Sequence, residues 1–284
     1  DVRLVYRLGD SSAAAVPARR VSLGWPIGDR SGLEATASFA LAAGRVVQAS
    51  GKADLVHIHG DFCESATCGL AGMLSSKVVI QTVHGRLNPR FRSPSRRAFR
   101  FVHQFIALGE GPAEDLSACG VADDRINVMS SGLNSALLNS SKRGITRHPG
   151  LVVCVGSLDK VKDHATLINA IRLMGPRSGI SLEILGDGPE RQALEFQTSG
   201  LPNVRFVGQV DRATVYRRLA AADAMVLCSK RLSGKGEGVP TVALEALALG
   251  VPCILSNAAS PTPAVTDTQS YWSFEAGNAV ELAQ

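Results

Sequence analysis

The sequence predicts an α/β protein of two domains, each built around a parallel β-sheet. Apolar runs rich in β-branched residues alternate with helical patterns along the whole chain, which is typical of strand and helix units that feed a parallel sheet. The length of 284 residues exceeds what one hydrophobic core usually serves. A polar, Ser-rich stretch at 134–150 is typical of a linker between two series of such units. We therefore expect an N-terminal domain at 1–148 and a C-terminal domain at 149–284.

In the first half, short apolar runs bounded by polar residues or glycine predict the strands, and a helical period predicts the segments between them. The expected strands lie at 2–6, 55–58, 78–83, 105–108 and 126–129. The expected helices lie at 33–48, 65–74 and 111–118.

The second half repeats this scheme, which supports a second sheet of the same kind. Its expected strands lie at 151–155, 182–185, 204–207, 224–228 and 252–255. Its expected helices lie at 164–173, 190–196, 213–221 and 241–249.

The composition is that of a soluble, globular chain and excludes several other classes. Hydrophobic residues make up 45% and charged residues 19% of the chain, unlike a disordered or fibrous protein. No apolar run approaches the roughly 18 residues that a membrane-spanning helix needs. The six cysteines lie mostly in apolar stretches and are expected to be reduced. Cys63 and Cys68 lack a second Cys or His pair that would complete a zinc site.

An excess of basic side chains favours partners that carry phosphate groups. The formal net charge is +5, which suits nucleotides, nucleic acid or an anionic membrane without choosing among them. The densest basic block is interleaved with phenylalanines and comprises Arg86, Arg90, Arg92, Arg96, Arg97 and Arg100 with Phe91, Phe99 and Phe101. This block is compatible with a solvated loop and helix, or with a surface that holds an anionic acceptor or lies on lipid headgroups.

The segment at 236–245, Gly-Glu-Gly-Val-Pro-Thr-Val-Ala-Leu-Glu, carries the most chemical information. It follows an expected strand, and Pro240 suits the first turn of the helix that it opens. Such a loop presents N–H groups at the carboxyl edge of a parallel sheet, where nucleotides bind. A diphosphate could lie on the N–H groups from Thr241 onward, with Glu245 accepting hydrogen bonds from ribose hydroxyls and Glu237 facing a sugar. By spacing alone, a solvent-exposed helix acid and an ordinary loop acid fit equally well.

With its Gly-Val-Pro and Glu-Ala-Leu-Ala-Leu-Gly context, this segment resembles the E-x7-E motif of the retaining glycosyltransferases of family four. Other elements of that family follow in the expected order, namely Gly156-Ser157-Leu158 with Lys162, Gly186-Asp187-Gly188-Pro189, Phe206-Val207-Gly208, Ala222-Asp223 and Ser229. Looser matches in the first half lie at 54–60, 83–85 and 130–134. The resemblance implies the GT-B fold, in which two Rossmann-like domains with parallel sheets face each other across a cleft.

The resemblance also implies a role for each matching residue. Lys162 neutralises the donor diphosphate, Glu245 holds the ribose, and Glu237 orients the transferred sugar. His84 would act with Glu237 at the reacting face. The other expected donor-binding residues are Ser157, Gly238, Val239, Pro240 and Thr241, and the acceptor or membrane side consists of His59, Gly85 and Arg86.

The implied reaction moves a sugar from a nucleotide-sugar, such as a UDP- or GDP-sugar, to a glycan or lipid-linked acceptor with retention of anomeric configuration. No Asp-x-Asp pair occurs in the sequence, so no metal and no other cofactor is expected. Cationic side chains and helix dipoles would then stabilise the leaving diphosphate. The expected location is the cytoplasm, at the inner face of the membrane through a peripheral contact with anionic lipid, and nucleic acid is not an expected partner.

Three departures from the family pattern bear on activity, and one of them is that Ser256-Asn257-Ala258-Ala259 lacks the expected Gly, with Ala264 where an acid is common. Ser157 stands where the family usually has an Arg, and Lys160 is the nearest substitute for its charge. The chain begins with Asp1 in what resembles the second strand of the family and stops at Gln284 in a starting helix. We therefore expect a fragment that lacks the first strand and helix unit and the last helix.

Other functions stay open. The principal alternatives are an inactive nucleotide-sugar-binding module and a GT-B sugar-nucleotide epimerase; a glycan phosphorylase would need a longer chain. The Gly186-Asp187-Gly188 turn alone is weak support for a dinucleotide oxidoreductase, because no ribose-binding acid follows at the usual distance. If the chain instead bound nucleic acid through the basic block, its affinity would fall steeply with salt and would not change when Glu245 is substituted.

Overall fold

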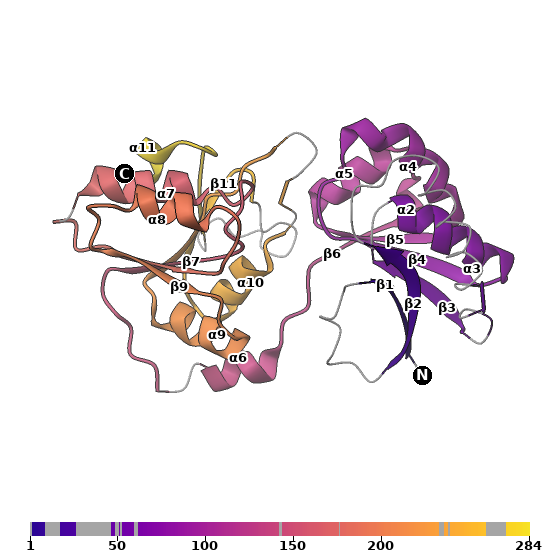
Figure 1. The fold of residues 1–284 in the computed structure, drawn as a ribbon, viewed down its shortest axis with the longest axis horizontal. Coiled ribbons are helices and arrows are strands. Elements are labelled where there is room, and N and C mark those ends of the chain that lie inside the picture. Colours follow the sequence, from indigo (N-terminus) through magenta and orange to yellow (C-terminus); the bar gives the residue numbers. More distant parts are fainter. Residues whose placement is uncertain are drawn as a thin grey trace. The chain divides into compact units, whose positions relative to one another are not determined.

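The structure is a computed structural model in which the chain forms two compact units (Figure 1). One unit comprises residues 1–107 and 112–128, and the other comprises 108–111 and 129–284. The structure describes residues 2–8, 18–26, 47–48, 51, 53–59, 62–141, 144–175, 177–232, 236–237, 239–259 and 271–284. Apart from residues 47–48, the helix predicted at 33–48 lies outside this part of the chain.

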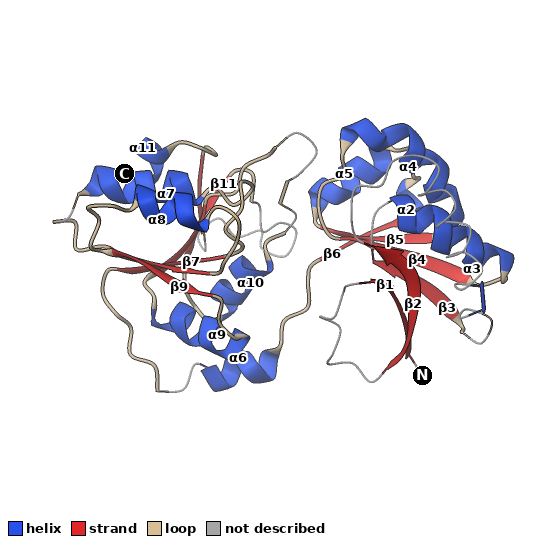
Figure 2. Ribbon diagram, viewed as in Figure 1, coloured by secondary structure: helices blue, strands red, loops and turns tan. Residues whose placement is uncertain are grey.

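The first unit contains a parallel sheet with the strand order β3-β4-β5-β6. These strands are Leu55–His59, Val78–Val83, Gln104–Leu108 and Ile126–Met129. A separate pair of parallel strands is formed by β1 (Val2–Leu8) and β2 (Ala18–Pro26). The helices α3 (Leu70–Leu74), α4 (Arg92–Ala98) and α5 (Glu110–Ala118) lie on one side of the four-stranded sheet (Figure 2).

Shorter helical segments complete the first unit. They are α2 (Phe62–Glu64), the π-helix η1 (Ser65–Gly69) and the 3₁₀ turns η2 (Pro89–Phe91), η3 (Phe99–Phe101) and η4 (Asp123–Arg125). The core beneath them is formed by fully buried apolar side chains on strands and helices, including Val79, Phe99, Phe105 and Leu116.

The second unit contains a parallel sheet with the strand order β12-β11-β10-β7-β8-β9. In chain order, the strands are Leu151–Val155, Ser181–Leu185, Val204–Gly208, Ala224–Leu227, Cys253–Ser256 and Tyr271–Phe274. The chain runs outward from β7 to β9 and then returns to the other side of β7 with β10. The loops after β7 and β10 therefore flank the point where the strand order reverses, which is where open α/β sheets bind ligands.

Helices cover both faces of this second sheet (Figure 1). One face carries α7 (His164–Met174), α8 (Arg191–Gln197) and α11 (Ala279–Leu282). The other carries α6 (Ser135–Ser141), α9 (Arg212–Ala221) and α10 (Thr241–Ala248). Burial on both faces explains why a strand such as β7 is continuously apolar rather than alternating.

The predicted α/β class with two parallel sheets is confirmed, but the expected linker at 134–150 contains a helix. The side-chain Oδ1 of Asn134 accepts a hydrogen bond from the N–H of Leu137 at 3.0 Å, which caps the start of α6. Leu138 is buried in the core of the second unit, and α6 packs against α9. The compact units consequently divide near residue 128, earlier in the chain than the domain boundary predicted after residue 148. Among the described elements, we did not predict β2, α2, α4, α6, β12 or the 3₁₀ turns η2, η3 and η4.

Candidate functional site

Asp159 organises the loop that follows β7 and carries Lys162. One carboxylate oxygen accepts hydrogen bonds from the N–H groups of Val161 at 2.9 Å and Lys162 at 3.1 Å, and the other accepts from the Ser157 hydroxyl at 2.6 Å. Burial acts to raise the pKa of Asp159, but these hydrogen bonds and the charge of Lys162 outweigh it and hold the pKa below its usual value. The loop is therefore shaped around an ionised carboxylate.

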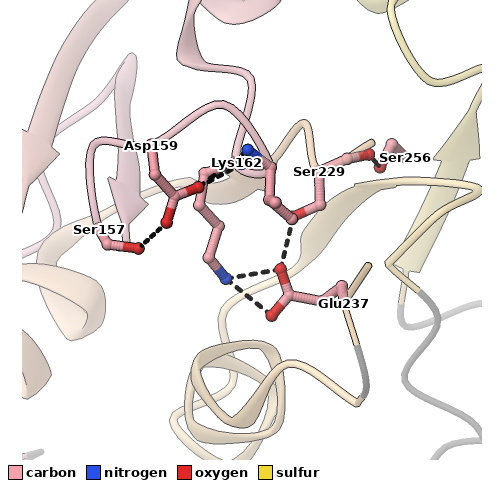
Figure 3. A network of polar contacts seen from close by, with 7 residues as sticks. Ser157, Asp159, Lys162, Ser229, Glu237 and Ser256 are labelled. Carbon is pink, nitrogen blue, oxygen red and sulfur yellow. Dashed lines mark hydrogen bonds and ion pairs between the residues drawn. The ribbon is translucent and has the colours of Figure 1, made fainter. Parts of the chain in front are cut away.

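Lys162 and Glu237 form an ion pair between the loops after β7 and β10 (Figure 3). The ammonium Nζ lies 2.7 Å and 2.6 Å from the two carboxylate oxygens of Glu237, and the Ser229 hydroxyl donates to the second of these at 2.7 Å. The Ser256 hydroxyl, at the end of β11, donates to the backbone carbonyl of Ser229. Both charged side chains are mostly buried, with 17% and 14% of their surfaces exposed. The polar groups thus come from the carboxyl ends of three neighbouring strands.

The Gly186-Asp187-Gly188 turn packs against the loop that holds Lys162. A Cβ on Gly186, whose φ is 142°, would lie 1.9 Å from the carbonyl oxygen of Gly156. A Cβ on Gly188 would lie 2.5 Å from the carbonyl oxygen of Leu158. Since real side chains cannot approach so closely, glycine at both positions is what lets the ends of β7 and β8 lie side by side.

Glu245 lies inside the second unit rather than on a wet helix face. It is only 4% exposed, although it occupies the second turn of α10. Tyr216, on α9, donates its hydroxyl to Oε1 at 2.8 Å, and Arg212 pairs with the same oxygen. Burial is the main reason that the pKa of Tyr216 is raised, so its hydroxyl stays a donor. The solvent-exposed alternative for Glu245 is thereby excluded.

At the start of α10, the backbone N–H groups of Thr241 and Val242 have no acceptor in the described part of the chain, whereas the N–H of Ala243 donates to the Pro240 carbonyl at 3.0 Å. Pro240 has an extended backbone and precedes the first helical residue, Thr241. The first N–H groups of a helix have no acceptor within it, so they are available to an anion. Val239 lies in the preceding bend, and Gly238 is outside the described residues.

His164 occupies the first turn of α7, next to Lys162 in the chain. Its side chain is buried, and neither ring nitrogen has a hydrogen-bond partner among the described residues. Burial and, secondarily, the charge of Lys162 lower its pKa to about 4. The imidazole is therefore neutral at pH 7.

In the first unit, a cluster of histidines lies at the carboxyl ends of β3 and β4. Nδ1 of His59 lies 2.9 Å from Nε2 of His84, so one nitrogen must donate and the other accept. Nε2 of His57 lies 2.8 Å from the Thr82 hydroxyl. Burial and then the neighbouring imidazoles lower the pKa values of His57 and His59. The structure thus joins two predicted residues, His59 and His84, whose ring contact the sequence did not predict.

Arg86 differs from the other arginines of the basic block because it forms ion pairs with two acidic side chains. Its guanidinium lies 3.0 Å from Glu114 and 2.9 Å from Asp115, both on α5. Phe99, which we expected to interleave with exposed arginines, belongs instead to the core. The exposed basic side chains that remain are Arg90, Arg92, Arg96, Arg97 and Arg100, beside a half-exposed Phe91.

The structure brings together some of the predicted site residues and adds others. Lys162 meets Glu237, while Ser157 contacts Asp159. Arg212 and Tyr216 were missed, although their spacing of four residues places them on one face of a helix. Within the described residues, no group of three or more His, Cys, Asp and Glu side chains is arranged to hold a metal ion. No helix in that part of the chain is long and apolar enough to cross a membrane.

Comparisons with known proteins agree with this arrangement. Residues 138–284 match the family described as glycosyl transferases group 1, and residues 1–137 match the family described as glycosyltransferase family 4. One relative is the amylovoran biosynthesis glycosyltransferase AmsK of Erwinia amylovora, 27% identical over 173 residues that cover 59% of this chain and 42% of the relative. Another is the lipopolysaccharide core biosynthesis glycosyltransferase LpsD of Rhizobium meliloti, which is 34% identical over 136 residues. These residues cover 47% of this chain and 37% of the relative. The chain thus spans less than half the length of either relative.

A solved structure supports the fold. The structure of Alr3699/HepE of Anabaena in complex with UDP superposes with a TM-score of 0.73, covering 85% of this chain and 70% of that one at 19% identity. At this identity the likeness establishes the GT-B architecture of the two units and leaves the chemistry to be argued from the residues.

Proposed function

Because the chain belongs to the group 1 glycosyl transferases, we propose that it transfers a sugar from a nucleotide-sugar donor to a glycan or lipid-linked acceptor. The observation that carries the proposal is the Lys162–Glu237 ion pair at the carboxyl edge of the second sheet, beside the strand where the order reverses. A mostly buried cation and acid at that edge suit a ligand that carries both phosphate and hydroxyl groups.

On the donor side, each group has a distinct task. The diphosphate would lie on the first N–H groups of α10 and on Lys162, which has three donors and can leave Glu237 for a phosphate. Glu245 would accept hydrogen bonds from the ribose, and Glu237, once released, would orient the sugar hydroxyls. HepE, which has the same fold, has been crystallised with UDP-glucose, which makes a UDP-sugar the first donor to test.

The proposed transfer retains the anomeric configuration of the sugar and uses no metal ion. Retention would follow if the leaving diphosphate itself took the proton of the acceptor on the same face of the sugar. Lys162 and the dipole of α10 would then stabilise the developing charge. Ser157 contributes no charge there, and exposed Lys160, in the same loop, is the candidate that we propose for an additional cation.

The first unit would serve the acceptor. His84 and Gly85 would line the reacting face, supported by His59. The exposed arginines near α4 would attract an anionic acceptor or the headgroups of the inner face of the membrane. The names of the relatives, amylovoran and lipopolysaccharide core biosynthesis, make a cell-surface glycan the class of acceptor that we propose.

Calorimetric titration with UDP, GDP, ADP and their sugar conjugates tests the donor site. We expect one nucleoside diphosphate to bind saturably to the wild type and to lose at least tenfold in affinity in Lys162→Ala and Glu245→Ala. Arg217→Ala, on exposed α9 surface, is the matched control. Binding that is unaffected by both site changes would refute the donor site.

Activity separates the principal alternatives. Incubation with the bound nucleotide-sugar and glycan or lipid acceptors should yield a glycosylated product and free nucleoside diphosphate. Binding without turnover would instead identify an inactive module, and a changed sugar that is still attached to the nucleotide would identify an epimerase.

A further inference from the structure

Glu245 is a buried carboxylate that α9 holds from one side only. Tyr216 and Arg212 both address Oε1, and in the described part of the chain no donor contacts the other oxygen, Oε2. An ionised carboxylate that is 4% exposed needs compensation by hydrogen bonds or charge. The two residues supply it and leave one oxygen for a ligand.

The two donors differ in how firmly they are themselves held. Tyr216 is fully buried, and its ring is fixed by the core of the second unit. The Arg212 side chain is 59% exposed, with its guanidinium 6.0 Å from the centre of the Tyr216 ring. Tyr216 is therefore suited to fixing the position of the carboxylate, while Arg212 supplies a compensating positive charge from the rim.

We propose that Tyr216 and Arg212 are positioning residues that hold Oε1 of Glu245, so that Oε2 accepts a hydrogen bond from a ribose hydroxyl and selects ribonucleotides over deoxyribonucleotides. The inference rests on the proposed function, because it takes the nucleotide to be bound at α10. It extends that function to the residues that set sugar selectivity in the nucleoside part of the donor. A carboxylate that could rotate freely would hold its acceptor oxygen less precisely and would discriminate less between ribonucleotides and deoxyribonucleotides.

The test compares UDP with 2′-deoxy-UDP and 3′-deoxy-UDP by calorimetry on the full chain. We expect the wild type to prefer UDP by about tenfold over one of the two deoxy ligands, as a hydrogen bond to a charged group allows. Glu245→Gln should reduce this preference. Tyr216→Phe, which keeps the ring and removes only the hydroxyl, should reduce it to about threefold or less, as should Arg212→Gln.

Arg217→Gln is the matched control, because Arg217 lies on the same helix, is exposed and bonds to Thr214 rather than to Glu245. It should leave the preference unchanged. Should Tyr216→Phe fail to fold, Arg212→Gln alters only an exposed side chain and still decides the matter. A purely structural role would lower thermal stability and weaken all three ligands equally, which would overturn the inference.

The outcomes separate this inference from the proposed function. If the folded wild type binds none of UDP, GDP and ADP, both fail; if it binds GDP or ADP instead, the deoxy forms of that nucleotide replace those of UDP. If UDP binds but Glu245→Gln keeps the full preference for UDP over the deoxy ligands, the positioning role is wrong and nucleotide binding stands. The same conclusion follows if Glu245→Gln loses this preference while Tyr216→Phe and Arg212→Gln both keep it.

Discussion

Removing either partner of the Lys162–Glu237 pair should lower stability, yet the two changes should move nucleotide affinity in opposite directions. Lys162→Met leaves the Glu237 carboxylate mostly buried, with the Ser229 hydroxyl as its remaining donor among the residues that the structure describes. Breaking a fully buried pair in this way costs about 3–5 kcal/mol. Because 17% and 14% of the two side chains remain exposed, water relieves part of the cost, and we expect a loss of about 2 kcal/mol.

Glu237→Gln should be destabilising for the same reason but should tighten the binding of UDP. A phosphate on Lys162 would lie roughly 5 Å from the Glu237 carboxylate, a repulsion of about 3 kcal/mol at an effective dielectric constant near 20. Screening and rearrangement reduce this, so we expect about a tenfold gain in affinity. Lys162→Met should lose at least tenfold.

Urea unfolding and calorimetry with UDP measure the two effects on the same samples. The double variant Lys162→Met/Glu237→Gln carries neither charge of the pair and should be more stable than Lys162→Met alone. The four proteins together give the coupling energy of the pair. The reasoning is refuted if Glu237→Gln weakens UDP binding, or if the two single changes add without coupling.

Three further changes test the surroundings of this pair. Asp159→Asn should lower the free energy of unfolding by about 1 kcal/mol at pH 7. Since hydrogen bonds depress the pKa of the wild-type carboxyl, the difference in stability between the two proteins should narrow as the pH falls below about 4. A difference that stays constant with pH in urea unfolding would contradict this. His164→Leu should make the free energy of unfolding less sensitive to acid. The buried imidazole has a pKa of about 4 in the folded chain and about 6.5 in the unfolded chain, so protonation favours the unfolded chain by up to about 3 kcal/mol as the pH falls between these values. If the unfolding free energies of the two proteins fell in parallel with pH, this prediction would be wrong. Gly186→Ala should cost more than about 3 kcal/mol in thermal unfolding, whereas Gly200→Ala, also at positive φ but with no atom within 4 Å of the added Cβ, should cost about 1 kcal/mol; equal costs would show that the close approach to Gly156 is unimportant.

Much of the fold follows from local pattern. The strands at 78–83, 126–129 and 151–155 have the predicted bounds because each apolar run is bounded sharply by polar residues or glycine. The helix α6 escaped prediction because its polar surface resembles a linker, and its stability depends on Asn134 and on the burial of Leu138. A helix held by tertiary contacts leaves a weak trace in composition.

The candidate site was predicted as a set of residues but not as a set of contacts. Lys162 was expected at the diphosphate and Glu237 at the sugar of one donor, yet their direct pairing spans 75 positions and depends on which strands are neighbours. Arg86 was expected on the acceptor or membrane side, and only the packing of α5 reveals that it pairs with Glu114 and Asp115. Pairwise electrostatics of this kind require the topology before they can be predicted.

The polar chain from Lys162 through Glu237 and Ser229 to Ser256 also has a consequence for biosynthesis. Its links join residues 75 and 27 positions apart, so no single segment of the polypeptide can form it locally. While the chain has been synthesised only as far as Ser229, just after β10, Lys162 and Ser229 are present but Glu237, the acid that joins them, is not. The donor loops therefore acquire their arrangement only after α10 and β11 have been synthesised, at a late step in the folding of the second unit.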